Sequence, residues 1–389
     1  MIFQFGNMLH KLYLCLVKVR YTYRFYPTDA QAQELSRVLG HTRFVYNWAL
    51  RMRTDAWANG EKVNYNQSSA ALTVLKKTEE FKWLNEVSCV PLQQALRNLQ
   101  TAFGNFFAGR AKYPRFKSKR DRQAAEYTTS AFKYSNGVLS LAKIGRLKVR
   151  WSRPFTSKPT TVTVSKTASG RYYASLVLDE TPVTFAKTGE TIGVDLGINR
   201  LATLSNGERI PNLRFTRTYE TKLAKAQRIL SRRTKGSGRW NRQRLRVARI
   251  HEKLSNARID HLNKVTTELV RRFDVIAVED LNVRGMVRNR KLAKHIGDAS
   301  FGRFISLLEY KCSWRGKKLV KMDRFFPSSK RCSCCGYVAQ SMPLDVRIWH
   351  CPECKREHDR DENAAKNILK FAVGQTVNAH GADVRPSQA

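Results

Sequence analysis

The sequence predicts an α/β protein of several domains, on three observations. Its 389 residues are enough for two or three domains. Segments of alternating apolar and polar residues, which indicate strands, occur near the N-terminus and again between residues 125 and 185. Segments with apolar residues at helical spacing occupy most of residues 29–108 and 217–272, so helices and strands are expected in separate blocks.

The first predicted strand is VKVRYTYRFYP, residues 17–27, whose apolar side chains occupy every second position with basic residues and threonine between them. Pro27 ends this strand. Thr28 follows as the expected N-cap of a helix, and Gln31 stands where a capping box requires it. We expect the mainly helical residues 29–122 to be an insertion within a β domain.

The rest of that β domain is predicted at residues 123–186. Within it, TVTVSKTASGRYYASLVLD (161–179) has two alternating runs around Ala168-Ser169-Gly170, a pattern typical of a β-hairpin. We expect this hairpin to join the strand at residues 17–26 in a small β-barrel.

The charge of the chain predicts a polyanionic partner. Lysine and arginine number 71 against 31 acidic residues, giving a formal net charge of +40 and a pI near 10.4. Nucleic acid is the first expectation, because binding it releases condensed counterions. An anionic membrane surface or a ribosomal-type structural role would also use this charge, but the many aromatic residues argue against a tail-like basic protein. No apolar run reaches the roughly 18 residues of a membrane-spanning helix, so no membrane partner is expected.

Two segments concentrate the positive charge. Residues 109–122 hold seven basic residues and one acid, interleaved with Tyr113 and Phe116, which suits phosphate contact and base stacking. Residues 217–272 hold seventeen basic residues against four acids, in two predicted helices broken at residues 235–238. The plainer interpretation of both is a solvated linker or helix face. The candidate nucleic-acid contacts are Arg110, Lys112, Arg115, Lys117, Lys119, Arg120, Arg232, Arg233, Arg239 and Arg242.

Two cysteine pairs predict a metal site. Cys332-x2-Cys335 and Cys351-x2-Cys354 are separated by fifteen residues, the spacing of a zinc ribbon in which each pair turns two thiolates onto one ion. Four sulfur ligands leave no open position, so one structural Zn²⁺ is expected. A redox pair or chance clustering is the alternative, and Cys334 is expected to be a spare. Clustered rather than dispersed cysteines indicate a reducing compartment, hence the cytoplasm.

Three acidic residues lie in or beside predicted apolar segments. Asp195 interrupts the apolar strand IGVDLG, and Glu279 directly follows an apolar run. Asp361 opens the helical segment that ends in NILKF. Buried carboxylates are costly unless paired or bound to a metal, so the three predict a Mg²⁺ or Mn²⁺ site. Salt bridges or a helix N-terminal charge would explain each one singly, and spacing leaves open whether Asp359 and Asp280 belong instead.

Five motifs of the chain resemble the TnpB family. These transposon-encoded RNA-guided DNA nucleases are also called OrfB transposases of insertion sequences and are similar to type V CRISPR effectors. The resemblance implies a RuvC-like nuclease domain with an RNase H fold, in which Asp195, Glu279 and Asp361 are the catalytic triad and hold two Mg²⁺ ions. It also implies that the four paired cysteines bind the zinc. The motifs are GVDLGINRLATLS (193–205), VIAVEDLNVRGM (275–286), DRFFPSSKRCSCCGY (323–337), HCPEC (350–354) and HDRDENAAKNIL (358–369).

The domain order follows from the same resemblance, except at the two ends. Residues 1–16 are expected to be a leader, and residues 372–389 a polar, disordered tail. The expected domains are a wedge-like β-barrel (17–28 and 123–186), a helical recognition lobe (29–122), the RuvC-like nuclease domain (187–331 and 355–371) and a zinc ribbon (332–354).

The resemblance implies an RNA-guided, Mg²⁺-dependent endonuclease that cuts double-stranded target DNA beside a short motif. Its partners would be a guide RNA from the transposon end and the target DNA, bound by one protein chain. Two alternatives stay open: a zinc-containing guided regulator that binds DNA without cutting it, and a transposase that joins DNA strands itself. The presence of all three acids favours cleavage, and the chain lacks an obvious tyrosine or serine recombinase signature.

Overall fold

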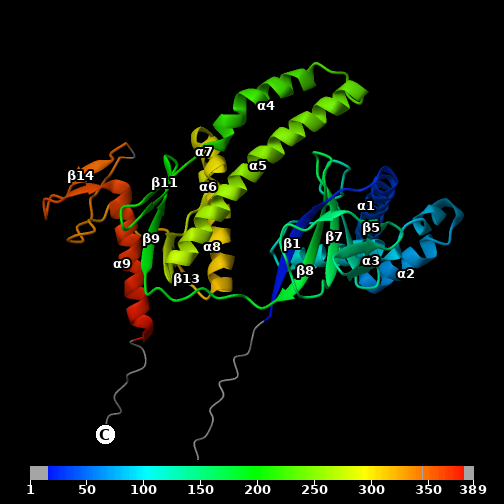
Figure 1. Ribbon diagram of the computed structural model, residues 1–389, viewed down its shortest axis with the longest axis horizontal. Helices are drawn as coiled ribbons and strands as arrows, with labels where there is room; N and C mark the ends of the chain where they lie inside the picture. Colours follow the sequence, from blue (N-terminus) through cyan, green and yellow to red (C-terminus); the bar gives the residue numbers. More distant parts are fainter. Residues whose placement is uncertain (1–15, 344, 381–389) are drawn as a thin grey trace, which may run out of the picture. The chain divides into compact units, whose positions relative to one another are not determined.

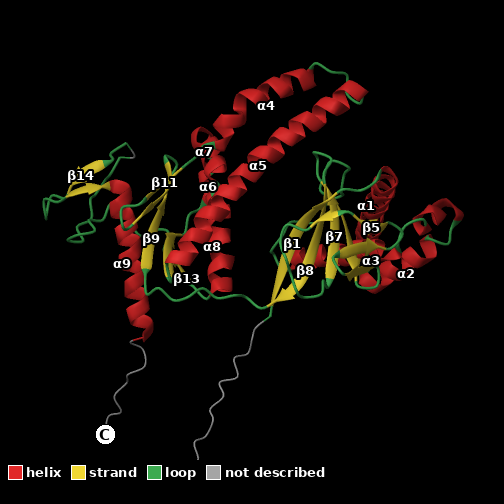
Figure 2. Ribbon diagram, in the orientation of Figure 1, coloured by secondary structure: helices red, strands yellow, loops and turns green. Residues whose placement is uncertain are grey.

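The computed structural model describes residues 16–343 and 345–380, and it divides into two compact units (Figure 1). The first unit ends at Thr181 and the second begins at Pro182. Each unit contains its own sheets and its own helices (Figure 2). Within the described ranges, no helix is long and apolar enough to cross a membrane.

A five-stranded antiparallel sheet, in the order β2-β7-β8-β1-β6, forms the centre of the first unit. Strand β1 pairs with β8 along its whole length, from Val17 opposite Glu180 to Phe25 opposite Tyr172. This register confirms that the first strand joins the predicted hairpin, whereas closure into a barrel stays a prediction. The strands are β1 (Val17–Phe25), β2 (Gln123–Thr128), β6 (Val149–Arg150), β7 (Thr161–Lys166) and β8 (Tyr172–Glu180), with a separate sheet of β3 (Phe132–Ser135), β4 (Val138–Leu141) and β5 (Gly145–Leu147).

The helices of the first unit follow β1 directly. The predicted capping box is present: the Thr28 hydroxyl accepts from the Gln31 N–H at 3.3 Å, and the Gln31 side chain accepts from the Thr28 N–H at 3.2 Å. The Gln31 amide also donates to the Arg146 carbonyl at 2.7 Å, which ties the start of the helix to β5. The helices are α1 (Asp29–Ala58), α2 (Tyr65–Leu75), the 3₁₀ helix η1 (Glu79–Asn85) and α3 (Cys89–Phe107).

A second five-stranded sheet, in the order β11-β10-β9-β12-β13, forms the centre of the second unit. Strands β9, β10 and β11 are an antiparallel meander, whereas β12 runs parallel to β9, and β13 parallel to β12. Parallel pairing needs a long crossover, which the two basic helices α4 (Phe215–Ser231) and α5 (Gly238–Arg272) supply between β11 and β12. The strands are β9 (Thr191–Leu196), β10 (Arg200–Leu204), β11 (Arg209–Pro211), β12 (Val275–Glu279) and β13 (Lys318–Met322).

Helices cover both faces of this sheet. On one face, Ile276 and Val278 of β12 belong to the large core that includes residues of α5 and α8. On the other, Ala277 packs with Ile368 of α9. Figure 1 shows α9 on one side of the sheet and α5 and α8 on the other, which explains why β12 is apolar at successive positions. The helices are α4 (Phe215–Ser231), α5 (Gly238–Arg272), α6 (Val283–Met286), α7 (Arg290–Ala299), α8 (Phe301–Arg315) and α9 (Arg360–His380).

Helix α9 extends further than the sequence predicted. The expectation of disorder from residue 372 onward is wrong as far as His380, because α9 continues to that residue. Ala372 is fully buried and packs with Met322 and Ile368, so the helix gains apolar contacts beyond the predicted end of the domain. The predicted leader, apart from Leu16, and the final residues 381–389 lie outside the described residues.

The cysteine-rich segment precedes α9 and contains its own two-stranded sheet. Strand β14 (Ile348–His350) pairs antiparallel with β15 (Glu357–Asp359), with Trp349 opposite His358. Residues 357–359, which the sequence analysis assigned to the nuclease domain, therefore form one strand of this small sheet. Strand β15 ends at Asp359, and α9 begins at the next residue, Arg360.

Candidate metal centres

The four predicted zinc ligands converge on one point. The sulfur atoms of Cys332, Cys335, Cys351 and Cys354 all lie within 4.8 Å of one another. The Cys332–Cys354 and Cys335–Cys351 sulfur pairs are 3.6 Å and 3.5 Å apart. Zinc–sulfur bonds of about 2.3 Å in a tetrahedron place neighbouring sulfurs about 3.8 Å apart, so the cluster fits one zinc ion. Four protein ligands would close the site to substrate.

The surroundings of Cys332 favour the thiolate that a metal requires. Burial raises the pKa of its thiol, but backbone N–H groups of Cys335 and Cys334 donate to the sulfur and bring the pKa down to about 6. The buried His358 ring places Nε2 3.0 Å from the same sulfur. A hydrogen bond of this kind orients a ligand sulfur. Cys334 is exposed and lies outside the four-sulfur cluster, in keeping with its expected role as a spare.

Asp195 and Glu279 lie on the same face of the second sheet. Val194 pairs with Val278 in the parallel register of β9 and β12, so these acids are the next residues along neighbouring strands. Side chains two positions apart in a strand share a face. A Cβ on Gly193 would point at α9, so Asp195, two positions on, also faces α9.

The third carboxylate is on α9 itself. Asp361 lies in the first turn of the helix, close enough to affect the ionisation of Asp195. The pKa of Asp195 is raised well above its usual range, first by burial and then by the charges of Glu279 and Asp361. Three converging acids in so basic a protein are candidate ligands of a cation.

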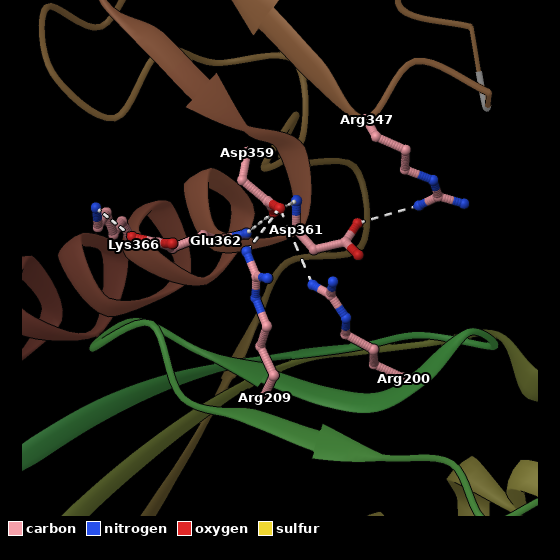
Figure 3. Close-up of polar contacts among 7 residues, drawn as sticks. All are labelled: Arg200, Arg209, Arg347, Asp359, Asp361, Glu362 and Lys366. Atoms are coloured by element: carbon pink, nitrogen blue, oxygen red, sulfur yellow. Dashed lines mark hydrogen bonds and ion pairs between the residues drawn. The ribbon is translucent and has the colours of Figure 1, made fainter.

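Individual contacts distinguish these acids from their neighbours. The Ser328 hydroxyl donates to Glu279 Oε1. The Arg347 guanidinium, which Figure 3 shows beside Asp361, lies 3.3 Å from Asp361 Oδ1. Asp280, by contrast, forms an exposed ion pair with Arg324 at 2.8 Å. Asp280 therefore already has a cationic partner on the surface.

Asp359 has a structural task at the start of α9. Its Oδ1 accepts hydrogen bonds from the backbone N–H groups of Asp361 and Glu362, at 3.0 Å and 3.1 Å, so it caps the helix (Figure 3). Its Oδ2 also pairs with Arg209 at 3.0 Å and lies 4.0 Å from Arg200. Asp280 and Asp359, the two alternatives that spacing left open, thus form ion pairs, as Asp361 does with Arg347, and the assignment of Asp361 and Glu279 to the site stays a prediction.

Three residues of the site were missed by the sequence analysis. Ser328 contacts Glu279, and the amides of Asn363 and Asn367 hold the backbone that leads from Ser328 to Cys332. A signal for the asparagines was present, because they are spaced four apart within the apolar segment NAAKNIL, where an unpaired amide would be costly. Nothing in the local sequence singled out Ser328.

The basic segment of the first unit is fixed on α1. Asn47 donates to the Lys117 carbonyl at 2.9 Å and accepts from its N–H at 2.8 Å. The Lys117 ammonium lies 3.8 Å from the centre of the Tyr46 ring, and the Tyr113 and Thr54 hydroxyls are 2.8 Å apart. The segment is therefore docked rather than a free linker. Its exposed predicted contacts are Arg110, Lys112, Arg115, Lys117, Lys119 and Arg120.

Two pockets flank this docked segment. One, of about 570 Å³, is lined by basic side chains that include Arg43, Arg115 and Lys117. The other, of about 630 Å³, contains the aromatic rings of Phe44 and Phe116. Cations and flat aromatic surfaces beside each other suit the phosphate and base of a nucleic acid.

The predicted contacts of the second unit lie where α4 meets α5, which form a long helical hairpin in Figure 1. Arg232, Arg239 and Arg242 are exposed, and Arg233 is half-buried with its guanidinium on the Arg239 carbonyl at 2.6 Å. None of the four forms an ion pair with an acid in the part of the chain that the structure describes. These cations are therefore available to an external anion.

Three family models match separate parts of the chain. A model described as "Probable transposase" matches residues 175–290, one described as "Cas12f1-like, TNB domain" matches residues 301–368, and one described as "Helix-turn-helix domain" matches residues 17–62. In the structure, residues 17–62 contain strand β1 and the single helix α1 rather than two helices joined by a turn.

Similar proteins extend this match. A Streptomyces pristinaespiralis protein named "Putative RNA-guided DNA endonuclease" is 52% identical over 377 residues, which cover 96% of this chain and 93% of that protein. The Escherichia coli K12 protein "Putative RNA-guided DNA endonuclease InsQ" is 32% identical, with 93% of each chain covered. A solved structure titled "Cryo-EM structure of the Cas12f1-sgRNA-target DNA complex" aligns with a TM-score of 0.60 at 11% identity, over 91% of this chain and 99% of that chain.

The solved structure shows that the chain shares the fold of the Cas12f1 protein in that complex. The relatives show its family. The chain belongs to the TnpB family, also called the OrfB family of insertion-sequence transposases.

Proposed function

We propose that this protein is an RNA-guided DNA endonuclease encoded by a transposon, which cuts double-stranded DNA beside a short motif. One observation carries the proposal: carboxylates from β9, β12 and α9 converge, so that burial and then the charges of Glu279 and Asp361 raise the pKa of Asp195. The names of the relatives and the charge of +40 support the nucleic-acid partners, a guide RNA from the transposon end and a target DNA.

The nuclease domain in this proposal is RuvC-like, with an RNase H fold. Its support is the strand order β11-β10-β9-β12-β13, in which an antiparallel meander is followed by two parallel strands. In the same proposal, the first unit comprises a wedge-like β domain with an inserted helical recognition lobe. The functional unit in this proposal is one protein chain bound to one RNA, in the cytoplasm.

The catalytic residues in this proposal are Asp195, Glu279 and Asp361. Their oxygens suit Mg²⁺ or Mn²⁺, and two such ions would stabilise the attacking water and the leaving oxygen of a phosphodiester. Asp195 and Glu279 present their charges from a rigid sheet, while Asp361 closes the site from the helix. Arg347, beside Asp361, is placed to contact a nearby phosphate.

The zinc has a structural role in the proposal. Cys332, Cys335, Cys351 and Cys354 would hold one Zn²⁺, whose function is to shape the segment that enters α9. Candidate nucleic-acid contacts are the basic segment at residues 109–122 and the tip of the α4–α5 hairpin.

Replacement of Asp361 tests the function directly. Purified protein with its guide RNA should cut target DNA in the presence of Mg²⁺, and Asp361→Asn should abolish cutting while RNA binding is unchanged. Asp260→Asn, at an exposed acid paired with Lys264 on α5, is the matched control and should leave the rate unchanged. If the Asp361→Asn protein cuts as fast as the natural protein, the assignment of the triad is wrong.

A guided regulator without cleavage is the alternative from a different class. The three acids weigh against it, and a titration of the cleavage assay with Mg²⁺ and Mn²⁺ separates the two. Absence of product at every metal concentration, with guided DNA binding intact, would favour the regulator. Donor DNA ends added to the same assay test the strand-joining activity that the family description "Probable transposase" suggests.

A further inference from the structure

The carboxylates of Glu279 and Asp361 come from elements that are far apart in the sequence. Glu279 ends strand β12, and Asp361 lies in the first turn of α9. A metal site needs such ligands held within about half an ångström. The segment from Ser328 to Ser333 supplies a connection between them, because it contacts Glu279 and is bound along its length by α9.

The first contact of this connection is made by Ser328. Its side chain is buried at 6% exposure, and its hydroxyl donates to Glu279 Oε1. This bond fixes one oxygen of the carboxylate and therefore the rotation of the group. A carboxylate that accepts a hydrogen bond on one oxygen still offers the other to a cation.

The second contact joins Ser328 to α9. The Asn367 amide donates to the Ser328 carbonyl at 2.8 Å and to the Arg331 carbonyl at 2.6 Å. One residue thus bonds Glu279 with its side chain and α9 with its backbone. Asn367 is 2% exposed, so its hydrogen bonds are made where water cannot replace them.

Two further residues on the same face of α9 extend the connection. Asn363 is 1% exposed; its amide donates to the Arg331 carbonyl at 2.7 Å, and its oxygen accepts from the Ser333 N–H at 2.8 Å. The Lys370 ammonium donates to the Ser333 carbonyl. Residues 363, 367 and 370 follow helical spacing, so one stripe of α9 holds the whole segment.

We propose that Ser328 is a positioning residue. It orients the Glu279 carboxylate and, through Asn367, fixes the position of that carboxylate relative to α9, the helix that carries Asp361. The inference rests on the proposed function, because it assigns Glu279 and Asp361 to one cation site. The ligand is a divalent cation of the Mg²⁺ or Mn²⁺ type. Ser328 touches neither the cation nor the substrate and acts through Glu279.

Direct metal binding tests this proposal without relying on cleavage. The full-length chain, free of nucleic acid, is titrated with Mn²⁺ while free Mn²⁺ is measured by electron paramagnetic resonance. Ser328→Ala should weaken Mn²⁺ binding about 10-fold, the usual effect of removing a partner of a metal ligand. Ser328→Thr keeps the hydroxyl and should restore binding to within about threefold of the natural protein.

Ser329→Ala is the matched control, since Ser329 is the neighbouring half-buried serine and forms no hydrogen bond with the three acids in the described ranges of the chain. It should leave Mn²⁺ binding unchanged. Thermal unfolding of each variant separates a fold defect from a site defect: a structural role alone would lower Tm for Ser328→Ala without changing Mn²⁺ affinity. Mn²⁺ affinity of Ser328→Ala within twofold of the natural protein would overturn the proposal.

The outcome also distinguishes this inference from the proposed function. If the natural protein binds Mn²⁺ in a Ser328-dependent manner but never cuts guided DNA, the positioning role stands and the nuclease assignment fails. If the natural protein cuts guided DNA, and the cleavage rate of the Ser328→Ala protein depends on Mg²⁺ concentration in the same way, the nuclease assignment stands and the positioning role fails.

Discussion

Gly193 of β9 lies directly beneath Ala365 of α9. A Cβ built on Gly193 would stand 2.1 Å from the Ala365 carbonyl oxygen and 2.7 Å from the Leu369 nitrogen. Both atoms belong to the helix backbone, which cannot rotate out of the way as a side chain can. The absence of a side chain at residue 193 therefore determines how closely α9, and with it Asp361, approaches Asp195.

Gly193→Ala should displace α9. Overpacking of this kind costs about 1–3 kcal/mol of the free energy of unfolding, and we expect a larger effect on cleavage, at least about 10-fold, because Asp361 moves away from the strand carboxylates. Thermal unfolding and the guided cleavage rate measure the two effects. Gly302→Ala in α8 is the control, because a Cβ there meets nothing within 4 Å. Equal cleavage rates for the two variants would contradict the close packing of α9.

The ion pair between Lys317 and Asp274 should make stability depend on pH in acid. The hydrogen bond from Lys317 lowers the pKa of Asp274 to about 2, from an ordinary value of 3.8, and the N–H groups of Gly189 and Thr188 contribute. A carboxyl group with a lowered pKa stabilises the fold fully above its unfolded pKa. That contribution should be lost as the pH falls from about 4 through 2, as urea unfolding at several pH values would measure.

Asp274→Asn should remove this acid dependence and leave Lys317 without its anion. The Lys317 side chain is 1% exposed, and loss of one partner of a buried pair costs about 3–5 kcal/mol of the free energy of unfolding. Asp260→Asn, which breaks an exposed pair on α5, should cost less than about 1 kcal/mol. A similar loss for both variants would show that the burial of Lys317 is unimportant.

Phe116 and Lys117 should affect nucleic-acid binding in different ways. Phe116 is 57% exposed, so Phe116→Ala should remove base stacking and weaken binding of a single-stranded oligonucleotide by about 5- to 100-fold without altering its salt dependence. Lys117→Gln should reduce the slope of log affinity against log salt by about one. Fluorescence anisotropy at several salt concentrations measures both.

The control for Phe116→Ala is Phe107→Ala, which removes a ring that is 70% exposed but lines neither pocket. It should leave the affinity unchanged. An oligonucleotide with an abasic site should bind the natural protein and the Phe116→Ala protein equally well. A smaller slope of log affinity against log salt for the Phe116→Ala protein would mean that the ring supports phosphate contacts and does not stack on a base.

Cys351→Ser should remove zinc and, through it, cleavage. Loss of one of four sulfur ligands should lower the bound zinc from one per chain to almost none, as atomic absorption would measure. The guided cleavage rate should fall because β15 leads directly into α9. Cys334→Ser removes a neighbouring thiol outside the cluster and should retain zinc. An unchanged cleavage rate after zinc loss would show that the zinc site does not determine the position of Asp361.

Local patterns predicted the elements of this protein well. Alternation identified β1 and the β7–β8 hairpin, and cysteine spacing identified the four sulfurs that converge. These predictions succeeded because their physical basis lies within a few residues. Disorder beyond Phe371 was a wrong prediction, since the burial of Ala372 depends on β13, which is distant in the sequence.

The assembly of the acidic site could not be read from local patterns. Asp195 meets Glu279 only because β9 and β12 pair in parallel across the whole α4–α5 crossover. Which of Asp359 and Asp361 caps α9 is likewise a matter of backbone geometry, which residue spacing does not give. The resemblance to TnpB proteins suggested these residues; their arrangement required the structure.

The dependence of the acidic site on α9 also affects when the site can form during synthesis of the chain. Asp195 and Glu279 leave the ribosome well before Asp361, which lies in the last described element of the chain. A nascent chain therefore carries two of the three carboxylates and an uncovered apolar face on its sheet. In the proposed nuclease, cutting ability would arise only as α9 docks, so synthesis itself would delay activity until the rest of the fold is in place.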